Sequence, residues 1–160
     1  MVIKQTLSNH LKTLWIAIFT TILFFILWMY HNFPIDMGVI FLIGYTLTVV
    51  PSFFLHISYY NRNKGMVAEI LPDRIRLVKD GEETLIASSE IKDIVVYKSA
   101  SMDKGGIPIT PMEAYFFVRI FTNDNNQYEL TCLMDTNIDQ SIKAVQGVKI
   151  FREKGLFNTV

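Results

Sequence analysis

Two uncharged, apolar runs separated by a short connection dominate the first third of this chain. Residues 14–30 read LWIAIFTTILFFILWMY, and residues 37–57 read MGVIFLIGYTLTVVPSFFLHI. Each run is long enough to cross the hydrocarbon core of a bilayer as a helix, the form that satisfies the backbone hydrogen bonds within the span. A connection of six residues makes the two helices antiparallel neighbours. The sequence therefore predicts a transmembrane helical hairpin, assigned to residues 1–60.

Basic residues flank this hairpin on one side only. Lys4 and Lys12 precede the first run, and Arg62 and Lys64 follow the second, whereas the connection has no Lys or Arg. Positive charge next to a span favours the cytoplasmic side. We therefore expect a multi-pass protein with both termini in the cytoplasm.

The remaining residues, 61–160, carry nearly all of the charge. Residues 1–60 contain three charged side chains, whereas residues 61–160 contain thirteen basic and fourteen acidic ones. A nearly neutral domain has no overall field that attracts duplex nucleic acid, which is not an expected partner. Neither apolar run contains Asp, Glu, Lys or Arg, which argues against an ion-coupled transporter. If the hairpin acts on the membrane, we expect it to do so as a homo-oligomer.

The pattern of residues 61–160 predicts an α+β domain, an antiparallel sheet or open barrel with a C-terminal helix. The turn signals Pro72-Asp73 and Asp80-Gly81 separate runs of period two. Residues 98–112 contain Gly, Pro and Ser and are expected to form a long loop. The expected strands are 66–71, 74–79, 83–87, 91–97, 113–121, 127–133 and 148–151, with a helix at 137–146.

Residues for catalysis are scarce in this domain. All three histidines lie within the first 60 residues, so the usual base for a Ser or Cys nucleophile is missing from residues 61–160. Cys132 is the single cysteine, which gives no basis for a zinc site or an intrachain disulfide. We expect a protein that is not an enzyme and holds no cofactor and no metal.

The run 113–121 is apolar on both faces of the expected strand. Tyr115, Phe117 and Arg119 share one face. The default interpretation is that this face packs in the core or against another subunit. The alternative is a ligand-binding surface, with flat rings stacked on Tyr115 and Phe117 and a phosphate held by Arg119.

Several other cations are candidates for the same anionic ligand. Arg74 and Arg76 alternate along one expected strand, and an Arg side chain holds a phosphate through two parallel hydrogen bonds. Lys98 and Lys104 flank the long loop. The alternative is an ordinary solvated face balanced by acidic neighbours. The predicted ligand-binding residues are Arg74, Arg76, Lys98, Lys104, Tyr115, Phe117 and Arg119.

Four segments carry a resemblance to a known family: ILPDRIRLV, SSEIKDIVVY, YFFVRIF and YELTCL. Together with the hairpin and the terminal helix, they resemble a bacterial pleckstrin-homology-like family of two-span membrane proteins. The resemblance implies a binding module in the bacterial inner membrane rather than an enzyme. The layout alone is also similar to CRISPR-associated membrane effectors that bind a cyclic oligoadenylate, with no shared residue motif.

Two functional hypotheses follow. The first is a membrane-anchored, non-enzymatic effector or receptor gated by a signal, as in antiviral defence. Its cytosolic domain would bind a small anionic ligand, such as a cyclic oligonucleotide, and its oligomers would act on the membrane. The second is a membrane-tethered pleckstrin-homology-like scaffold that binds a protein partner or a lipid headgroup.

Overall fold

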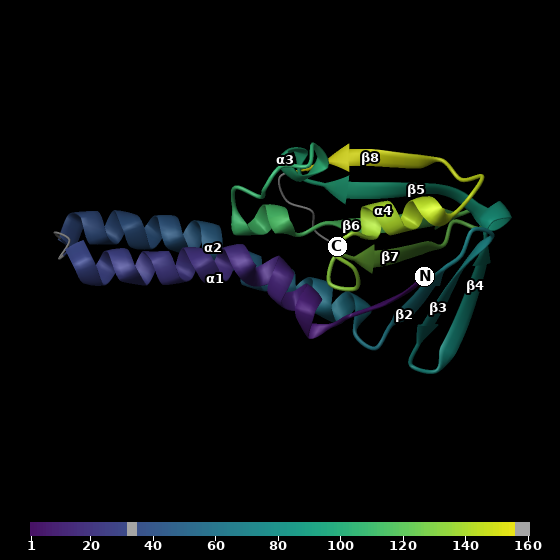
Figure 1. The fold of residues 1–160 in the computed structure, drawn as a ribbon, viewed down its shortest axis with the longest axis horizontal. Helices are drawn as coiled ribbons and strands as arrows, with labels where there is room; N and C mark the ends of the chain where they lie inside the picture. The colour runs from purple at the N-terminus through teal and green to yellow at the C-terminus, as the bar shows by residue number, and fades with distance from the viewer. Residues whose placement is uncertain (32–34, 156–160) are drawn as a thin grey trace.

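The computed structural model of the chain describes residues 1–31 and 35–155. Helices α1 (Leu7–His31) and α2 (Ile35–Asn63) form an antiparallel pair that projects from one end of a sheet domain (Figure 1). Both helices are long and apolar enough to cross a membrane. Most of the predicted connection between them, residues 32–34, lies outside the described residues.

The sheet domain contains two four-stranded sheets. The first sheet has the order β1-β2-β3-β4 and is antiparallel throughout. The second has the order β7-β6-β5-β8, in which β8 joins parallel to β5. The bounds are β1 Val2–Lys4, β2 Val67–Ile70, β3 Arg74–Lys79, β4 Glu82–Ala87, β5 Ile91–Lys98, β6 Phe117–Thr122, β7 Gln127–Thr131 and β8 Ile150–Lys154.

Strand β1 was not predicted, because three residues are too few to show a pattern of period two. It pairs with β2, and Val2 lies opposite Glu69. The Met1 ammonium donates to the Ile70 carbonyl oxygen at 2.8 Å, and the Ile70 N–H donates to the Met1 carbonyl oxygen at 2.7 Å. The helical hairpin is therefore inserted between two neighbouring strands of one sheet.

Both helices extend past the apolar runs on the side of the sheet domain. The extensions contain polar residues, which is why a search for uncharged spans ends before them. Tyr59 and Asn63, in the last turns of α2, are fully buried. The domain ends of the helices are therefore part of the domain core.

The segment between β5 and β6 is more structured than the loop that we predicted. It contains a short helix α3 (Ala100–Asp103) and a 3₁₀ turn η2 (Pro111–Ala114), so β6 starts at Phe117 rather than at residue 113. The 3₁₀ turn packs against both α1 and α2.

The predicted helix at 137–146 is shorter in the structure. It consists of α4 (Ile138–Ser141) followed by one 3₁₀ turn, η3 (Ile142–Ala144). Ile138 and Ile142 are fully buried, as expected for the apolar face of this helix. They join Ile94, Ile120 and Leu130 of the second sheet in the core. The predicted antiparallel-sheet domain is thus present, with one parallel strand added after its helix.

Candidate functional site

The junction between the hairpin and the sheet domain is built from hydrogen bonds that are partly or fully buried. His10 Nδ1 of α1 lies 2.9 Å from His56 Nε2 of α2. The other nitrogen of that ring, His56 Nδ1, lies 3.0 Å from the Tyr115 hydroxyl, next to η2. Burial raises the pKa of Tyr115 well above its ordinary value, so this group remains a neutral phenol. The three side chains connect both helices to the second sheet.

Asn63, the last residue of α2, binds β7 as a neighbouring strand would. Its amide Nδ2 donates to the Glu129 carbonyl oxygen at 2.8 Å. Its Oδ1 accepts from the Thr131 N–H at 2.9 Å. Asn63 is fully buried, so both bonds are shielded from water. The end of α2 thereby covers the β7 edge of the second sheet.

Helix α1 is attached through Asn9. Its amide Nδ2 donates to the carbonyl oxygens of Met134 at 2.8 Å and Leu133 at 3.3 Å. These carbonyls belong to the turn that follows β7. Since α1 and α2 are held separately, the hairpin cannot swing about one flexible linker.

The aromatic face that we predicted for ligand stacking lies in this junction. Tyr115 is fully buried and Phe117 is 2% exposed. The Tyr59 ring of α2 meets the Tyr115 ring edge-on, with centroids 5.4 Å apart. The stacking interpretation was wrong for these two residues, and the default core interpretation is correct. The domain end of α2 covers this aromatic face, and the sequence pattern did not predict that contact.

Arg119 is held by an ion pair. Its Nη2 lies 2.5 Å from Glu129 Oε1, and its guanidinium lies over the Tyr97 and Phe117 rings. The other carboxylate oxygen of Glu129 lies 2.6 Å from Arg62 Nε. Arg119 is therefore not the free phosphate ligand that we predicted.

The other predicted cations lie on different sheets. On β3, Arg76 makes two bonds to Glu83, at 2.8 and 3.0 Å, and Arg74 lies 3.6 Å from Asp73. This matches the alternative of a solvated face with balanced charge. The contact with Arg76 lowers the pKa of the Glu83 carboxyl.

On the second sheet, Lys98 is largely buried and lies 3.1 Å from Asp139. Lys104 is exposed at the end of α3. The structure does not gather Lys98 and Lys104 with Arg74 and Arg76 into one patch. The two arginines lie on the first sheet, whereas Lys98 ends β5 of the second sheet and Lys104 follows α3.

Sequence reasoning missed a pair of cations that the fold does bring together. Arg62 and Lys79 line two adjoining hollows, of about 390 Å³ and about 260 Å³, beside the end of α2. The Lys79 ammonium lies 3.5 Å from the Arg62 carbonyl oxygen. The two residues are 17 positions apart in the sequence. Only the tertiary structure, which brings the end of β3 beside the end of α2, reveals them as neighbours.

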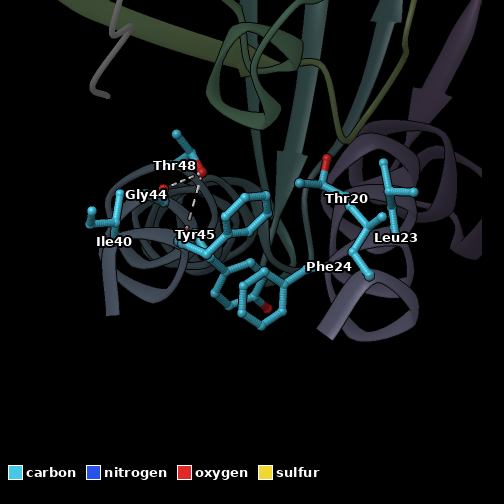
Figure 2. Close-up of a pocket in the computed structure, with 9 residues that line it drawn as sticks. Thr20, Leu23, Phe24, Ile40, Gly44, Tyr45 and Thr48 are labelled. Atoms are coloured by element: carbon cyan, nitrogen blue, oxygen red, sulfur yellow. Dashed lines mark hydrogen bonds between the residues drawn. The ribbon is translucent and has the colours of Figure 1, made fainter. Parts of the chain in front are cut away.

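A third hollow lies between the helices, away from the sheet domain. It is an apolar groove of about 410 Å³. Figure 2 shows Thr20 and Leu23 of α1 across from Ile40, Gly44 and Thr48 of α2, with Phe24 and Tyr45 between them. A methyl group added at Gly44 would meet nothing within 4 Å. The small residues at 44 and 48 therefore do not mark the contact between α1 and α2.

The comparison with protein families gives one result. A family model described as a PH domain matches residues 2–140. The chain belongs to this PH-domain family. The match includes β1, both helices of the hairpin and both sheets as far as α4, so the inserted hairpin lies within the matched PH-domain unit. No curated protein and no solved structure matches the chain. The likeness to CRISPR-associated effectors stays a prediction.

Proposed function

We propose that this PH-domain protein is a membrane-anchored, non-enzymatic binding module. In this proposal the hairpin spans the inner membrane of a bacterium with both ends on the cytoplasmic side. The observation that carries it is the insertion of the hairpin between β1 and β2, with both helices hydrogen-bonded into the domain. Such a hairpin holds the domain in one orientation at the membrane surface.

The surface of the hairpin supports a membrane location. Beyond the junction the helices expose large apolar side chains almost all round, an area that a soluble protein does not leave in water. These side chains include Phe19, Ile22, Phe25, Ile26, Met29, Ile40, Leu42, Ile43 and Leu47.

Cysteine labelling tests this topology. Cys132 is fully buried, and burial raises the pKa of its thiol to about 11, so the natural thiol reacts slowly at neutral pH. In spheroplasts, Asp36→Cys at the hairpin tip should react with a membrane-impermeant maleimide. Lys64→Cys should react only after the membrane is opened. Equal labelling of both positions in closed spheroplasts would contradict the proposal.

We propose a protein as the partner of the module, because the predicted ligand residues other than Lys104 are buried or paired. Strand β4 pairs with β3 alone among the described residues, which leaves an open edge for an added strand. Leu85 on β4 is 56% exposed. A protein that co-purifies with the full chain should be lost with Leu85→Lys and retained with Phe151→Lys on β8. Loss from both variants, or from neither, would contradict docking on β4.

The signal-gated receptor remains a second candidate, favoured by the hollows at Arg62 and Lys79. In this alternative a small anion, such as a cyclic oligonucleotide, binds Lys79 beside the end of α2 and draws Arg62 from its ion pair with Glu129. Calorimetry on the full chain in nanodiscs should show binding that Lys79→Gln weakens at least tenfold, whereas Lys143→Gln serves as the exposed control. If cyclic di- and oligonucleotides do not bind, this candidate fails.

The receptor candidate also requires a homo-oligomer, and the groove between the helices is the place where copies would meet. The open space at Gly44 admits a side chain from another helix. Gly44→Leu should then shift the protein in nanodiscs from oligomer to monomer. Thr46→Leu, at an exposed position of the same helix outside the groove, is the control.

A further inference from the structure

The loop that connects α3 to η2, residues 104–110, presents two apolar side chains to the outside. Ile107 is 72% exposed and Ile109 is 82% exposed. The loop follows α3, which lies at the end of the domain from which the hairpin projects (Figure 1). The exposed isoleucines therefore belong to the side of the domain that faces the membrane in the proposed function.

Hydrogen bonds fix the backbone of this loop. The Glu113 carboxylate, which is 8% exposed, accepts from the Ser101 hydroxyl at 2.5 Å and from the Ile109 N–H at 3.1 Å. The Gly106 N–H donates to the Ser101 carbonyl oxygen at 3.0 Å. These bonds hold the backbone on both sides of Ile107 while its side chain points away from the core.

The length of the hairpin fixes where the membrane surface lies. The apolar run 14–30 covers about 25 Å along a helix at about 1.5 Å per residue. The hydrocarbon core of a bilayer is about 30 Å thick. The hydrocarbon core must therefore take in the whole run, including the buried residues Ile16 and Ala17 near its domain end. Helix α1 also packs against η2. The loop at 104–110 directly precedes η2.

The charges beside the loop suit a bilayer surface. Lys104 is exposed, and the carboxylate of Asp103 is already paired with Arg152 and Lys154. Together these four groups carry a net positive charge. Cations next to apolar side chains favour the headgroup layer of a membrane that contains anionic lipid.

We propose that the loop at 104–110 inserts Ile107 and Ile109 into the cytoplasmic interface of the membrane that the hairpin crosses, with Lys104 among the headgroup phosphates. The inference rests on the proposed membrane anchoring. The contact gives the domain a third attachment besides the two helices and limits its tilt against the plane of the membrane. Strand β4 would then be presented at a constant angle to the membrane.

Fluorescence of the full chain in nanodiscs of phosphatidylcholine and phosphatidylglycerol tests the contact. An environment-sensitive dye at Ile109→Cys should emit at shorter wavelength than the same dye at Leu85→Cys. Lipids spin-labelled near the headgroup should quench the dye at position 109 and leave the one at 85 unchanged. Equal wavelength and equal quenching at both positions would overturn the proposal. A blue shift at 109 without lipid quenching would also overturn it, because protein rather than lipid would then shield the dye from water.

Proteolysis gives a second measurement that does not use a dye. Trypsin cleavage after Lys104 should be slow in nanodiscs and should rise severalfold in the double variant Ile107→Ser/Ile109→Ser. Cleavage after Lys143, which is exposed elsewhere, should not change. Equal cleavage after Lys104 in both proteins contradicts membrane insertion of the loop. The labelling of Asp36→Cys tells whether the anchoring has failed as well, since loss of the loop contact alone leaves that topology intact.

Discussion

The two halves of the hairpin are held together by different forces. Near the sheet domain, polar side chains of both helices make buried hydrogen bonds, as Asn63 does to β7. In the far half, contacts between rings predominate, and the Phe24 and Tyr45 rings stack with centroids 4.5 Å apart. The near half therefore fixes the orientation of the hairpin relative to the sheet domain. The far half has few polar contacts of its own, so its stability depends on the apolar environment around it.

The largest expected effect is at Asn63. Asn63→Ala leaves the Glu129 carbonyl and the Thr131 N–H buried without this partner, which should destabilise the protein by about 3 kcal/mol. The matched control is Asn61→Ala, two positions away on the exposed side of α2. Thermal unfolding in detergent measures both variants. Similar melting temperatures for the two variants would mean that the junction does not hold the hairpin.

A smaller loss is expected at Tyr115. Tyr115→Phe keeps the buried ring but removes the hydroxyl that lies 3.0 Å from His56. The net cost of one such bond is about 1 kcal/mol. A double-mutant cycle with His56→Phe should give a coupling energy of similar size. Additive effects of the two substitutions would show that the contact contributes nothing.

In the far half, Thr21→Val tests the one hydrogen bond between α1 and α2 that the structure describes there. The Thr21 hydroxyl lies 3.1 Å from the Tyr45 hydroxyl and also donates to the Ala17 carbonyl oxygen of its own helix. Bonds of this kind between membrane helices contribute about 0.6 kcal/mol on average. SDS titration should show a loss of that order. A loss equal to that of Asn63→Ala would remove the contrast between the halves.

The smallest effect is expected at Gly44. A methyl group there meets no atom within 4 Å, so Gly44→Ala should leave the unfolding of the monomer unchanged. A clear destabilisation in SDS titration would indicate that the groove is filled in the folded protein. Gly38→Ala is the contrasting variant, because its added Cβ would lie 3.1 Å from the Trp28 ring.

The sequence alone predicted the elements whose patterns are long. Uncharged runs located α1 and α2, and alternation located β3 and β5 close to their observed bounds. The family resemblance is confirmed at the level of the PH domain. Strand β1 was not predicted, because only its pairing with β2 identifies these three residues as a strand. The two strands are separated by 62 residues of intervening chain.

The site was less predictable than the fold. Alternation correctly indicated that both faces of β6 are covered. It does not identify the cover, so a bound ligand stayed open beside core or subunit packing for Tyr115 and Phe117. Charge alone does not show whether a cation is paired, and Arg76 and Arg119 proved to have acidic partners. The closeness of Arg62 and Lys79 depends on tertiary packing, for which no local pattern exists.

The insertion of the hairpin between β1 and β2 also orders the steps of biosynthesis. When β1 leaves the ribosome, its partner strand has not yet been translated. Both helices have been translated before Val67 is. The first sheet can form only if the two helices bring β2 back to the end of the hairpin where β1 lies. In the proposed membrane topology, a chain whose two helices fail to insert together would keep β1 and β2 apart. Completion of the first sheet would then depend on correct insertion of the hairpin.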